Sequence, residues 1–448
     1  MTDAPALRPV PVQAASSWQA WLPSLIVFQL VYLISYVDRQ ILSLVVGPVK
    51  ASLRLDDVQI GLLQGFAFSM VMAVSAMVTA SLVDTGNRVR LLGIAIICWC
   101  AMTIACGLAQ DFWMLLFARS GLAIAEGVVP VAALSLLADI VPRTSLPRAG
   151  ALLMLSPYLG SGAALLLGGP ILVALQPYDG VQMPIVGTFE PWRGLFILLG
   201  APGILLGAAI LLFMAEPPRK KTDSTTPASK TSVIPFLKDN WRFLLTLMTF
   251  LTFLNTISQS IYSWTPTFMI RVYGYDPAQV GLVVGPIFVI AGTAGCLLGT
   301  YIMSAKAPET ALTHVVRAMV RMMGLFTIPL LLFPLSPWPW LSLALLAVSL
   351  CLLASVASST LTPATLFAPS EVRGRVIAVC ALYSGGLGGM GPLFVGAITD
   401  WGFGSSARID YALTISFAVV LVVAWMTGPR AAKMAARIDR SNAERSST

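Results

Sequence analysis

Residues 112–139 have the sequence FWMLLFARSGLAIAEGVVPVAALSLLAD, in which Arg119 and Glu126 are the only ionisable side chains before the final Asp139. A transmembrane helix needs roughly 20 mostly apolar residues, and this stretch is longer than that. It has no alternation of apolar and polar residues, which argues against a membrane-spanning β-strand. The sequence therefore predicts a membrane-spanning helix with two charges inside it.

The composition of the whole chain agrees with this prediction. Its 448 residues are 57% hydrophobic and 11% charged, whereas a soluble domain carries about 25% charged residues. So few charges cannot cover the surface of a soluble protein of this length. The composition excludes a soluble enzyme, a nucleic-acid-binding protein and a disordered scaffold, and it predicts an integral membrane protein.

Twelve stretches are long and apolar enough to span a membrane, and they form an all-α protein of two six-helix halves. In the first half they are residues 22–49, 57–83, 90–110, 112–139, 147–175 and 192–214; in the second they are 241–270, 278–303, 312–334, 338–366, 373–399 and 409–429. Residues 1–21 form an N-terminal tail, 215–240 a basic linker and 430–448 a C-terminal tail. The bundles 22–214 and 241–429 are pseudo-symmetric, a plan typical of secondary transporters.

The distribution of basic residues predicts the orientation. If both termini are cytoplasmic, the cytoplasmic side holds 21 Lys and Arg residues and the opposite side holds five. Cytoplasmic loops of membrane proteins carry such an excess. The same bias explains the net charge of +8 without any acidic partner. We therefore expect a multi-pass protein of a cell membrane with both termini in the cytoplasm.

Four ionisable residues lie deep inside predicted spans, namely Asp38 and Arg39 in the first and Arg119 and Glu126 in the fourth. A charge at this depth costs about 2.5–3.5 kcal/mol even on lenient scales, so such residues pair with each other or line a water-filled cavity. They indicate either a static packing network or a site for transport and coupling.

The spacing of these residues suggests how they pair. Asp38 and Arg39 are about 100° apart around their helix, so each needs a partner elsewhere, and the fourth span offers one of each sign. Arg119 and Glu126 share a helix face about 10.5 Å apart. Two acids and two bases form a neutral set. Protonation of either carboxylate would leave an arginine able to receive an anion.

Spans seven to eleven carry no ionisable residue in their middle but offer hydroxyl and amide groups, at Asn255, Ser258, Gln259, Tyr262, Ser358, Ser359, Thr360 and Tyr383. A cavity between the halves would then be charged on one wall and mostly apolar on the other, which suits an amphipathic substrate. The fifth span contains Gly160, Gly162, Gly168 and Gly169 before Pro170, a pattern typical of close helix packing or of a hinge.

Several kinds of chemistry have no signature in the sequence. The chain has no GxxxxGK[ST] phosphate-binding loop, and its six cysteines form no zinc-binding pattern. No nucleophile–base pair or metal set suggests an enzyme. We therefore expect no cofactor, no metal and no nucleic-acid partner.

Taken together, these features resemble the major facilitator superfamily, through the twelve spans, the basic central linker, Asp84 with Arg88 and Arg90 after the second span, and Arg119 in the fourth. Tyr36 to Ser43 and Arg119 to Gly127 are similar to the Spinster branch, as are Ala138-Asp139 and Gly160-Ser161-Gly162. Members of that branch export lysolipids and sphingosine 1-phosphate, and bacterial members are common.

The resemblance implies a proton-coupled, alternating-access transporter of a lysolipid- or sphingolipid-like substrate, a monomer in the bacterial inner membrane. Asp38 and Glu126 would be the protonation sites, with Arg39 and Arg119 as charge partners and head-group ligands. The residues implied for the substrate cavity are Tyr36, Asn255, Gln259, Tyr262, Ser359 and Tyr383. Those implied for the cytoplasmic gate are Asp84, Arg88, Arg90, Asp139, Arg148, Glu371 and Arg375.

This chain departs from the family's loop pattern, because Ala80 replaces a glycine, Thr85 a basic residue and Ser304 an acid. The gate would then depend more on Asp84 paired with Arg88, and on Asp139 and Glu371. A symporter of a small organic anion and a drug exporter remain alternatives within the same superfamily, and a non-transporting membrane sensor is an alternative outside the transporters.

Overall fold

The computed structural model describes residues 18–142, 144–183, 187–219, 233–304, 310–369 and 371–447. Residues 1–17 of the predicted tail and 220–232 of the predicted linker lie outside this part of the chain, as do Arg143, Lys306 and Ser370. The described residues contain twelve helices long and apolar enough to cross a membrane. The prediction of an all-α membrane protein with twelve spans is confirmed.

The first half of the chain contains six of these spans, some built from several helical segments. Its elements are α1 (Trp18–Leu44), α2 (Val46–Leu53), α3 (Asp57–Gly61), η1 (Leu62–Phe66), α4 (Ala67–Thr85), α5 (Arg88–Leu108), α6 (Phe112–Ile140), α7 (Leu146–Leu153), α8 (Ser156–Leu175), η2 (Gln176–Tyr178), β1 (Gln182–Met183), β2 (Gly187–Thr188) and α9 (Pro191–Phe213). The two short strands pair antiparallel.

The second half contains the other six spans. Its elements are α10 (Val233–Asp239), α11 (Trp241–Tyr273), α12 (Pro277–Met303), α13 (Ala311–Leu332), α14 (Pro339–Ala357), α15 (Thr362–Phe367), α16 (Arg373–Gly388), α17 (Met390–Ala397), η4 (Ile398–Phe403), η5 (Ser406–Arg408) and α18 (Ile409–Ser447). The predicted linker is thus helical over its last described residues, in α10.

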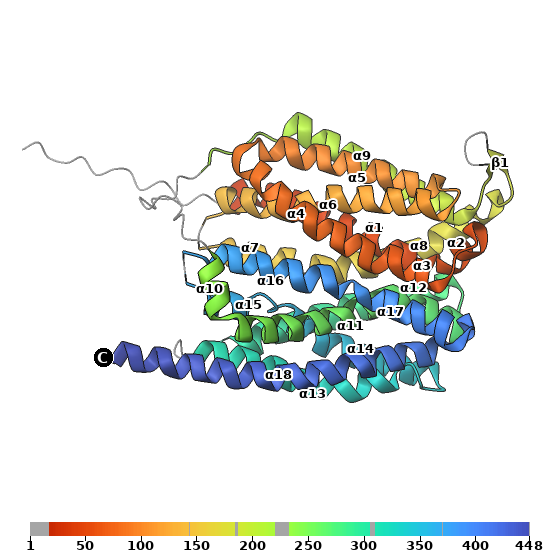
Figure 1. Ribbon diagram of the computed structural model, residues 1–448. Helices are drawn as coiled ribbons and strands as arrows, with labels where there is room; N and C mark the ends of the chain where they lie inside the picture. The colour runs from red at the N-terminus through yellow and green to blue at the C-terminus, as the bar shows by residue number, and fades with distance from the viewer. Residues whose placement is uncertain are drawn as a thin grey trace, which may run out of the picture.

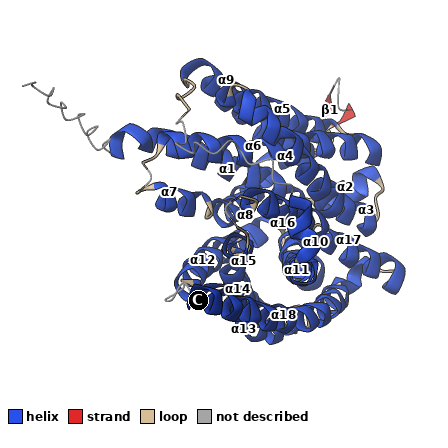
Figure 2. Cartoon of the chain, turned by 60° about the vertical axis from the view of Figure 1, so that its left-hand side comes forward, coloured by secondary structure: helices blue, strands red, loops and turns tan. Residues whose placement is uncertain are grey.

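The helices run roughly parallel along one long axis, as Figure 1 shows. The C-terminus and α10 lie at one end of the bundle, which we call the terminal side, and α2, α3 and β1 lie at the other end, the far side. Figure 2 shows the two halves as an upper and a lower group of helices, with α8, α12, α16 and α17 along the boundary.

Four predicted spans are divided by a helix break that was not predicted, and in three of them a proline follows the end of the helix by four residues. A proline ring collides with the carbonyl group four residues earlier and offers no N–H to it. One helix ends at Leu44 and is followed by Pro48, a second ends at Leu153 before Pro157, and a third ends at Gly388 before Pro392; in each case the proline comes four residues later. Pro170, the predicted hinge, lies inside the uninterrupted helix α8.

The two halves meet where glycines let helix backbones touch. A Cβ atom on Gly281 of α12 would collide with the carbonyl oxygen of Leu165 in α8, and one on Gly162 would lie 2.7 Å from the carbonyl oxygen of Gly285. Only residues without a side chain allow this approach. The close-packing interpretation of the glycine-rich fifth span is therefore the one that the structure supports.

On the far side, a cluster of charges closes the space between the halves. The buried carboxylate of Asp57 accepts hydrogen bonds from Lys50 Nζ at 2.5 Å and from two nitrogens of Arg271, each at 2.8 Å. Lys50 belongs to the first half and Arg271 to the second, and Lys50 also donates to Ser406 Oγ at 3.1 Å. Asp57 thereby ties both halves together at this end.

The last span is longer than predicted. The sequence predicts that it ends near residue 429, but α18 continues as a helix to Ser447. Ala431 and Ala435 of this extension are fully buried, and Asp439 accepts hydrogen bonds from the Thr313 backbone N–H at 2.9 Å and from its hydroxyl group at 2.6 Å. The carboxylate therefore caps the first turn of α13, whose N–H groups have no partner within the helix.

We expect Asp439→Ala to lower the stability of the protein by about 1 kcal/mol, the usual cost of losing a helix cap. Thermal unfolding of the purified protein in detergent would show this as a lower midpoint. Arg440→Ala, on the neighbouring exposed residue, serves as the control. Equal midpoints for the two variants would contradict the capping role.

Candidate functional site

A buried ion pair joins α1 and α6 near the middle of the first half. Arg39 Nε donates to Glu126 Oε2 at 2.6 Å, and the Glu126 side chain is completely buried. The guanidinium group also donates to Ser35 Oγ at 3.3 Å and lies 4.8 Å from the centre of the Tyr36 ring. Burial removes water from the pair, so each charge depends on the other.

Asp38 points in another direction and forms no ion pair with an arginine among the described residues. Its Oδ2 atom accepts hydrogen bonds from Trp99 Nε1 at 2.8 Å and Thr103 Oγ1 at 3.3 Å, both on α5. The expectation that Asp38 would also find its partner on the fourth span is therefore wrong. Because adjacent residues are about 100° apart around a helix, Arg39 faces α6 while Asp38 faces α5.

Arg119 is buried without a carboxylate partner. Its Nε donates a long hydrogen bond, 3.4 Å, to the carbonyl oxygen of Leu63, and among the described residues its Nη1 atom has no hydrogen-bond partner. The guanidinium groups of Arg119 and Arg39 lie 4.9 Å and 5.4 Å from the centre of the Phe68 ring. Two cations thus share one aromatic ring, an arrangement that leaves Arg119 able to bind an anion.

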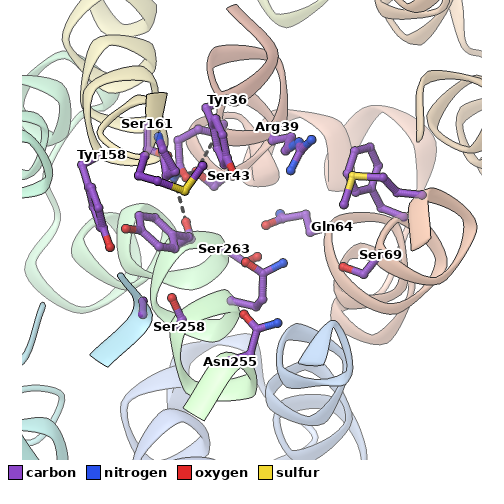
Figure 3. Close-up of a pocket in the computed structure, with 18 of the residues that line it drawn as sticks. Tyr36, Arg39, Ser43, Gln64, Ser69, Tyr158, Ser161, Asn255, Ser258 and Ser263 are labelled. Carbon is purple, nitrogen blue, oxygen red and sulfur yellow. Dashed lines mark hydrogen bonds between the residues drawn. The ribbon is translucent and has the colours of Figure 1, made fainter. Parts of the chain in front are cut away.

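A central cavity of about 300 Å³ lies between the halves, as Figure 3 shows. Its described lining residues are, from the first half, Tyr36, Arg39, Gln40, Ser43, Gln64, Phe68, Ser69, Met72, Arg119, Met154, Pro157, Tyr158 and Ser161, and from the second half, Asn255, Ser258, Gln259, Tyr262, Ser263, Ala357 and Ser358. Among these side chains, only Arg39 and Arg119 carry a charge near neutral pH. The carboxylates of Asp38 and Glu126 lie behind the cavity wall.

The second-half wall of the cavity corrects one prediction. The sequence predicts that this wall is mostly apolar, but Asn255, Ser258, Gln259 and Ser263 make it polar and uncharged. The reason is that these four residues lie within nine positions of α11, so their spacing brings several of them to one helix face. A ligand that fits this wall needs hydrogen-bonding groups.

The predicted cavity residues fall into two groups. Tyr36, Asn255, Gln259 and Tyr262 are among the lining residues, whereas Ser359 and Tyr383 are not. Ser359 is buried at the turn after α14, and Tyr383 packs against the apolar cluster beneath α16.

Gln40 and Gln64 line the cavity but were not predicted. Gln40 follows Asp38 and Arg39 directly, and its amide nitrogen donates to the Tyr262 carbonyl oxygen across the two halves at 2.7 Å. Gln64 lies in the π-helical segment η1, and such segments are frequent at functional sites. Both residues could have been recognised in the sequence, because each places a polar amide inside an apolar span.

The predicted gate residues lie on the terminal side, but they pair differently from the prediction. The buried guanidinium group of Arg88 forms ion pairs with Asp139 and, at 2.6 Å, with Glu216, whereas Asp84 is exposed. Asp139 and Glu216 lie where α6 and α9 end, and their carboxylates flank the start of α5. In this structure the Arg88 cluster therefore joins helices of the first half.

The other predicted gate residues are Arg90, Arg148, Glu371 and Arg375, which are exposed at the terminal side. Their role as a gate stays a prediction. The protonation and substrate roles of the central residues likewise stay predictions.

Residues 29–392 match the family model of the Major Facilitator Superfamily. This covers most of the sequence, so the chain belongs to the Major Facilitator Superfamily, a family of membrane transporters. The resemblance to that superfamily, stated from the motifs, is confirmed.

The curated relatives carry different names, among them a probable sugar efflux transporter of Helicobacter pylori, 27% identical over 254 residues, which is 56% of this chain and 58% of that protein. An MFS-type efflux pump of Mycolicibacterium smegmatis is 26% identical over 391 residues, which is 84% of this chain and 83% of that protein. A protein of Arabidopsis thaliana named probable sphingolipid transporter spinster homolog 2 is 24% identical over 321 residues, or 64% of this chain and 62% of the relative.

A solved structure shares the fold. The crystal structure of a bacterial homolog to the human lysosomal transporter Spinster, in an inward-facing and unoccupied conformation, matches 95% of this chain and 98% of its own. The TM-score is 0.75 at 21% sequence identity. The Spinster resemblance is thus confirmed for the fold.

The buried pair leads to a prediction for a double-mutant cycle. Arg39→Gln leaves the Glu126 carboxylate buried without a counter-ion, and we expect a loss of about 3 kcal/mol in unfolding free energy. The double variant Arg39→Gln with Glu126→Gln should recover more than half of that loss. Denaturation of the purified protein measures each value. Losses that simply add would show that the two side chains do not depend on each other.

Proposed function

We propose that this chain is a proton-coupled secondary transporter that moves a lysolipid- or sphingolipid-like anion across a bacterial inner membrane by alternating access. The observation that carries the proposal is the arrangement of charge around the central cavity. The guanidinium groups of Arg39 and Arg119 face the cavity, and the carboxylates of Asp38 and Glu126 lie behind it.

The cavity wall favours an anionic head group. Arg119 is 1% exposed and its Nη1 atom lacks a partner among the described residues, so an incoming phosphate or carboxylate would supply the missing hydrogen bond. Arginine binds such groups through two parallel hydrogen bonds. The hydroxyl and amide groups of Ser258, Asn255 and Gln259 would contact the polar part of the same ligand.

A neighbouring cavity favours an apolar tail. A groove of about 500 Å³ lies between α7 and α12 and shares Met154 and Ser358 with the central cavity. Its remaining described lining is Arg148, Ala151, Leu152, Leu155, Cys296, Leu297 and Thr300, most of which is apolar. The two spaces together suit a molecule with a compact anionic end and a hydrocarbon end, as a lysolipid has.

The Arg39–Glu126 pair suggests how a proton could be coupled to this substrate. Burial disfavours a charged carboxylate, and a neighbouring arginine favours it. When Glu126 takes up a proton, Arg39 loses its counter-ion and becomes a receptor for the anionic head group. Proton binding and substrate binding would then change the same ion pair, which is the kind of differential interaction that shifts a conformational equilibrium.

The orientation belongs to the same proposal. With the terminal side in the cytoplasm, the 21-to-five distribution of Lys and Arg follows the rule for cytoplasmic loops. On this proposal the Asp57 cluster on the far side closes the periplasmic end, and the groove between α7 and α12 lies towards the cytoplasmic half of the bundle. The proposed conformation is then an inward-facing one.

A small organic anion is the second candidate, because the central cavity is compact and polar on both walls. Ligand competition on the purified protein separates the two. We expect sphingosine 1-phosphate or a lysophosphatidic acid to bind and succinate not to compete at millimolar concentration. Displacement by succinate, with lysolipids inert, would favour the small-anion symporter instead.

The Arg119→Gln variant tests the head-group contact. Loss of one charged hydrogen-bonding partner costs about 1.5–3 kcal/mol, so we expect lysolipid affinity to fall by at least about tenfold. Arg317→Gln, an exposed cation far from the cavity, should bind as the wild type does. Unchanged affinity in Arg119→Gln would remove this residue from the site.

Proton coupling is tested by a conformational reporter measured across pH. If Glu126 and Asp38 carry the proton, the wild-type balance between inward- and outward-facing states depends on pH, and Glu126→Gln with Asp38→Asn loses most of that dependence. Spin-label distances across the far side provide the measurement. A double variant that responds to pH as the wild type does would place the proton elsewhere.

A further inference from the structure

A basic pocket outside the transport cavity lies between the start of α11 and the extension of α18. It has a volume of about 440 Å³. Its described lining residues are Trp241, Arg242, Leu245, Thr246, Arg430, Lys433, Met434 and Arg437. Four of the eight carry a positive charge and none is acidic. The central transport site uses none of them.

The helical frame of this pocket is well anchored. Ala431 and Ala435 are buried on the inner face of α18, a Cβ on Gly428 would meet the Phe250 ring of α11, and Asp439 caps α13. On the outer face, Arg430, Lys433 and Arg437 follow one another at spacings of three and four residues, so they share one side of the helix. The helix segment that carries these cations is therefore fixed relative to α11.

Counter-charges are lacking within the described part of the chain. Arg242, Arg430, Lys433 and Arg437 form no ion pair with a described acidic side chain, and the nearby Asp439 accepts from Thr313. Four like charges around one pocket repel each other, and an anion between them removes that repulsion. The chemistry of the pocket thus selects an anionic ligand.

The surface next to the pocket is apolar, which suits a ligand that has an apolar part beside its anionic group. Val422 and Met426 precede Arg430 at spacings of four, and they are 59% and 52% exposed. One stripe of α18 therefore changes from apolar to cationic along its length. Trp241 and Leu245 are also about half exposed. Tryptophan and basic residues are typical of the level where lipid head groups meet the hydrocarbon region.

We propose that this pocket binds the head group of an anionic phospholipid from the surrounding membrane, with the acyl chains lying along Val422 and Met426. The phosphodiester contacts Arg430, Lys433 and Arg437 on α18 and Arg242 on α11, so the lipid bridges the two helices. Basic pockets between spans on the cytoplasmic side bind such head groups in membrane proteins. The site is independent of the transported substrate.

Native mass spectrometry of the full-length protein in detergent tests the proposal. Phosphatidylglycerol and phosphatidylcholine are added at equal concentration, and we expect phosphatidylglycerol to bind about tenfold more tightly. Arg430→Gln with Arg437→Gln should abolish this preference. The matched control is Arg317→Gln with Arg321→Gln, two exposed arginines in the first half of α13, and it should keep the preference.

Three outcomes would overturn the proposal. Equal binding of the two lipids by the wild type would do so, and this comparison needs no variant to fold. Equal losses in the two double variants would indicate diffuse attraction between basic residues and acidic lipids. Displacement of phosphatidylglycerol by millimolar inorganic phosphate would indicate a site for a soluble anion. Arg430→Lys with Arg437→Lys keeps the charge and should keep most of the preference.

Discussion

The interaction on which the centre of this protein depends is the ion pair between Arg39 and Glu126. Neither side chain could lie at this depth alone, because a buried charge without a partner costs several kcal/mol. The pair fixes α1 against α6 and places the Arg39 guanidinium group at the cavity wall. Asp38 and Arg119 complete a set with no net charge, although they are not bonded to each other.

The arrangement of this set gives the cavity its character. The carboxylates lie behind the wall, held by Arg39 in one case and by Trp99 and Thr103 in the other. The guanidinium groups lie at the surface of the cavity, both within 5.4 Å of the centre of the Phe68 ring. The four residues therefore carry no net charge together, but the groups that face the cavity, and that a ligand would contact, are positively charged.

The sequence predicted the number of spans, the two halves and the charged residues of the centre, because charge inside apolar stretches is easily recognised. It did not predict the direction in which each charge points: Asp38 faces α5 and Arg88 pairs with Asp139 and Glu216. Such pairings depend on how helices are placed around one another, which span lengths do not determine. Prolines accompany the helix breaks at Pro48, Pro157 and Pro392, but Pro130 and Pro170 lie inside unbroken helices, so local sterics alone do not tell which proline ends a helix. The polar residues of α11 were recognised in the sequence, but the sequence did not show that they face the cavity.

The glycine contacts between α8 and α12 have a consequence for how the two halves fit together. Some of these contacts join backbone atoms, as between Gly281 and the Leu165 carbonyl group, whereas at Gly285 the side chain of Leu166 lies against the glycine. A methyl group added at any of these glycines would push α8 and α12 apart, and with them the two halves that meet at this boundary.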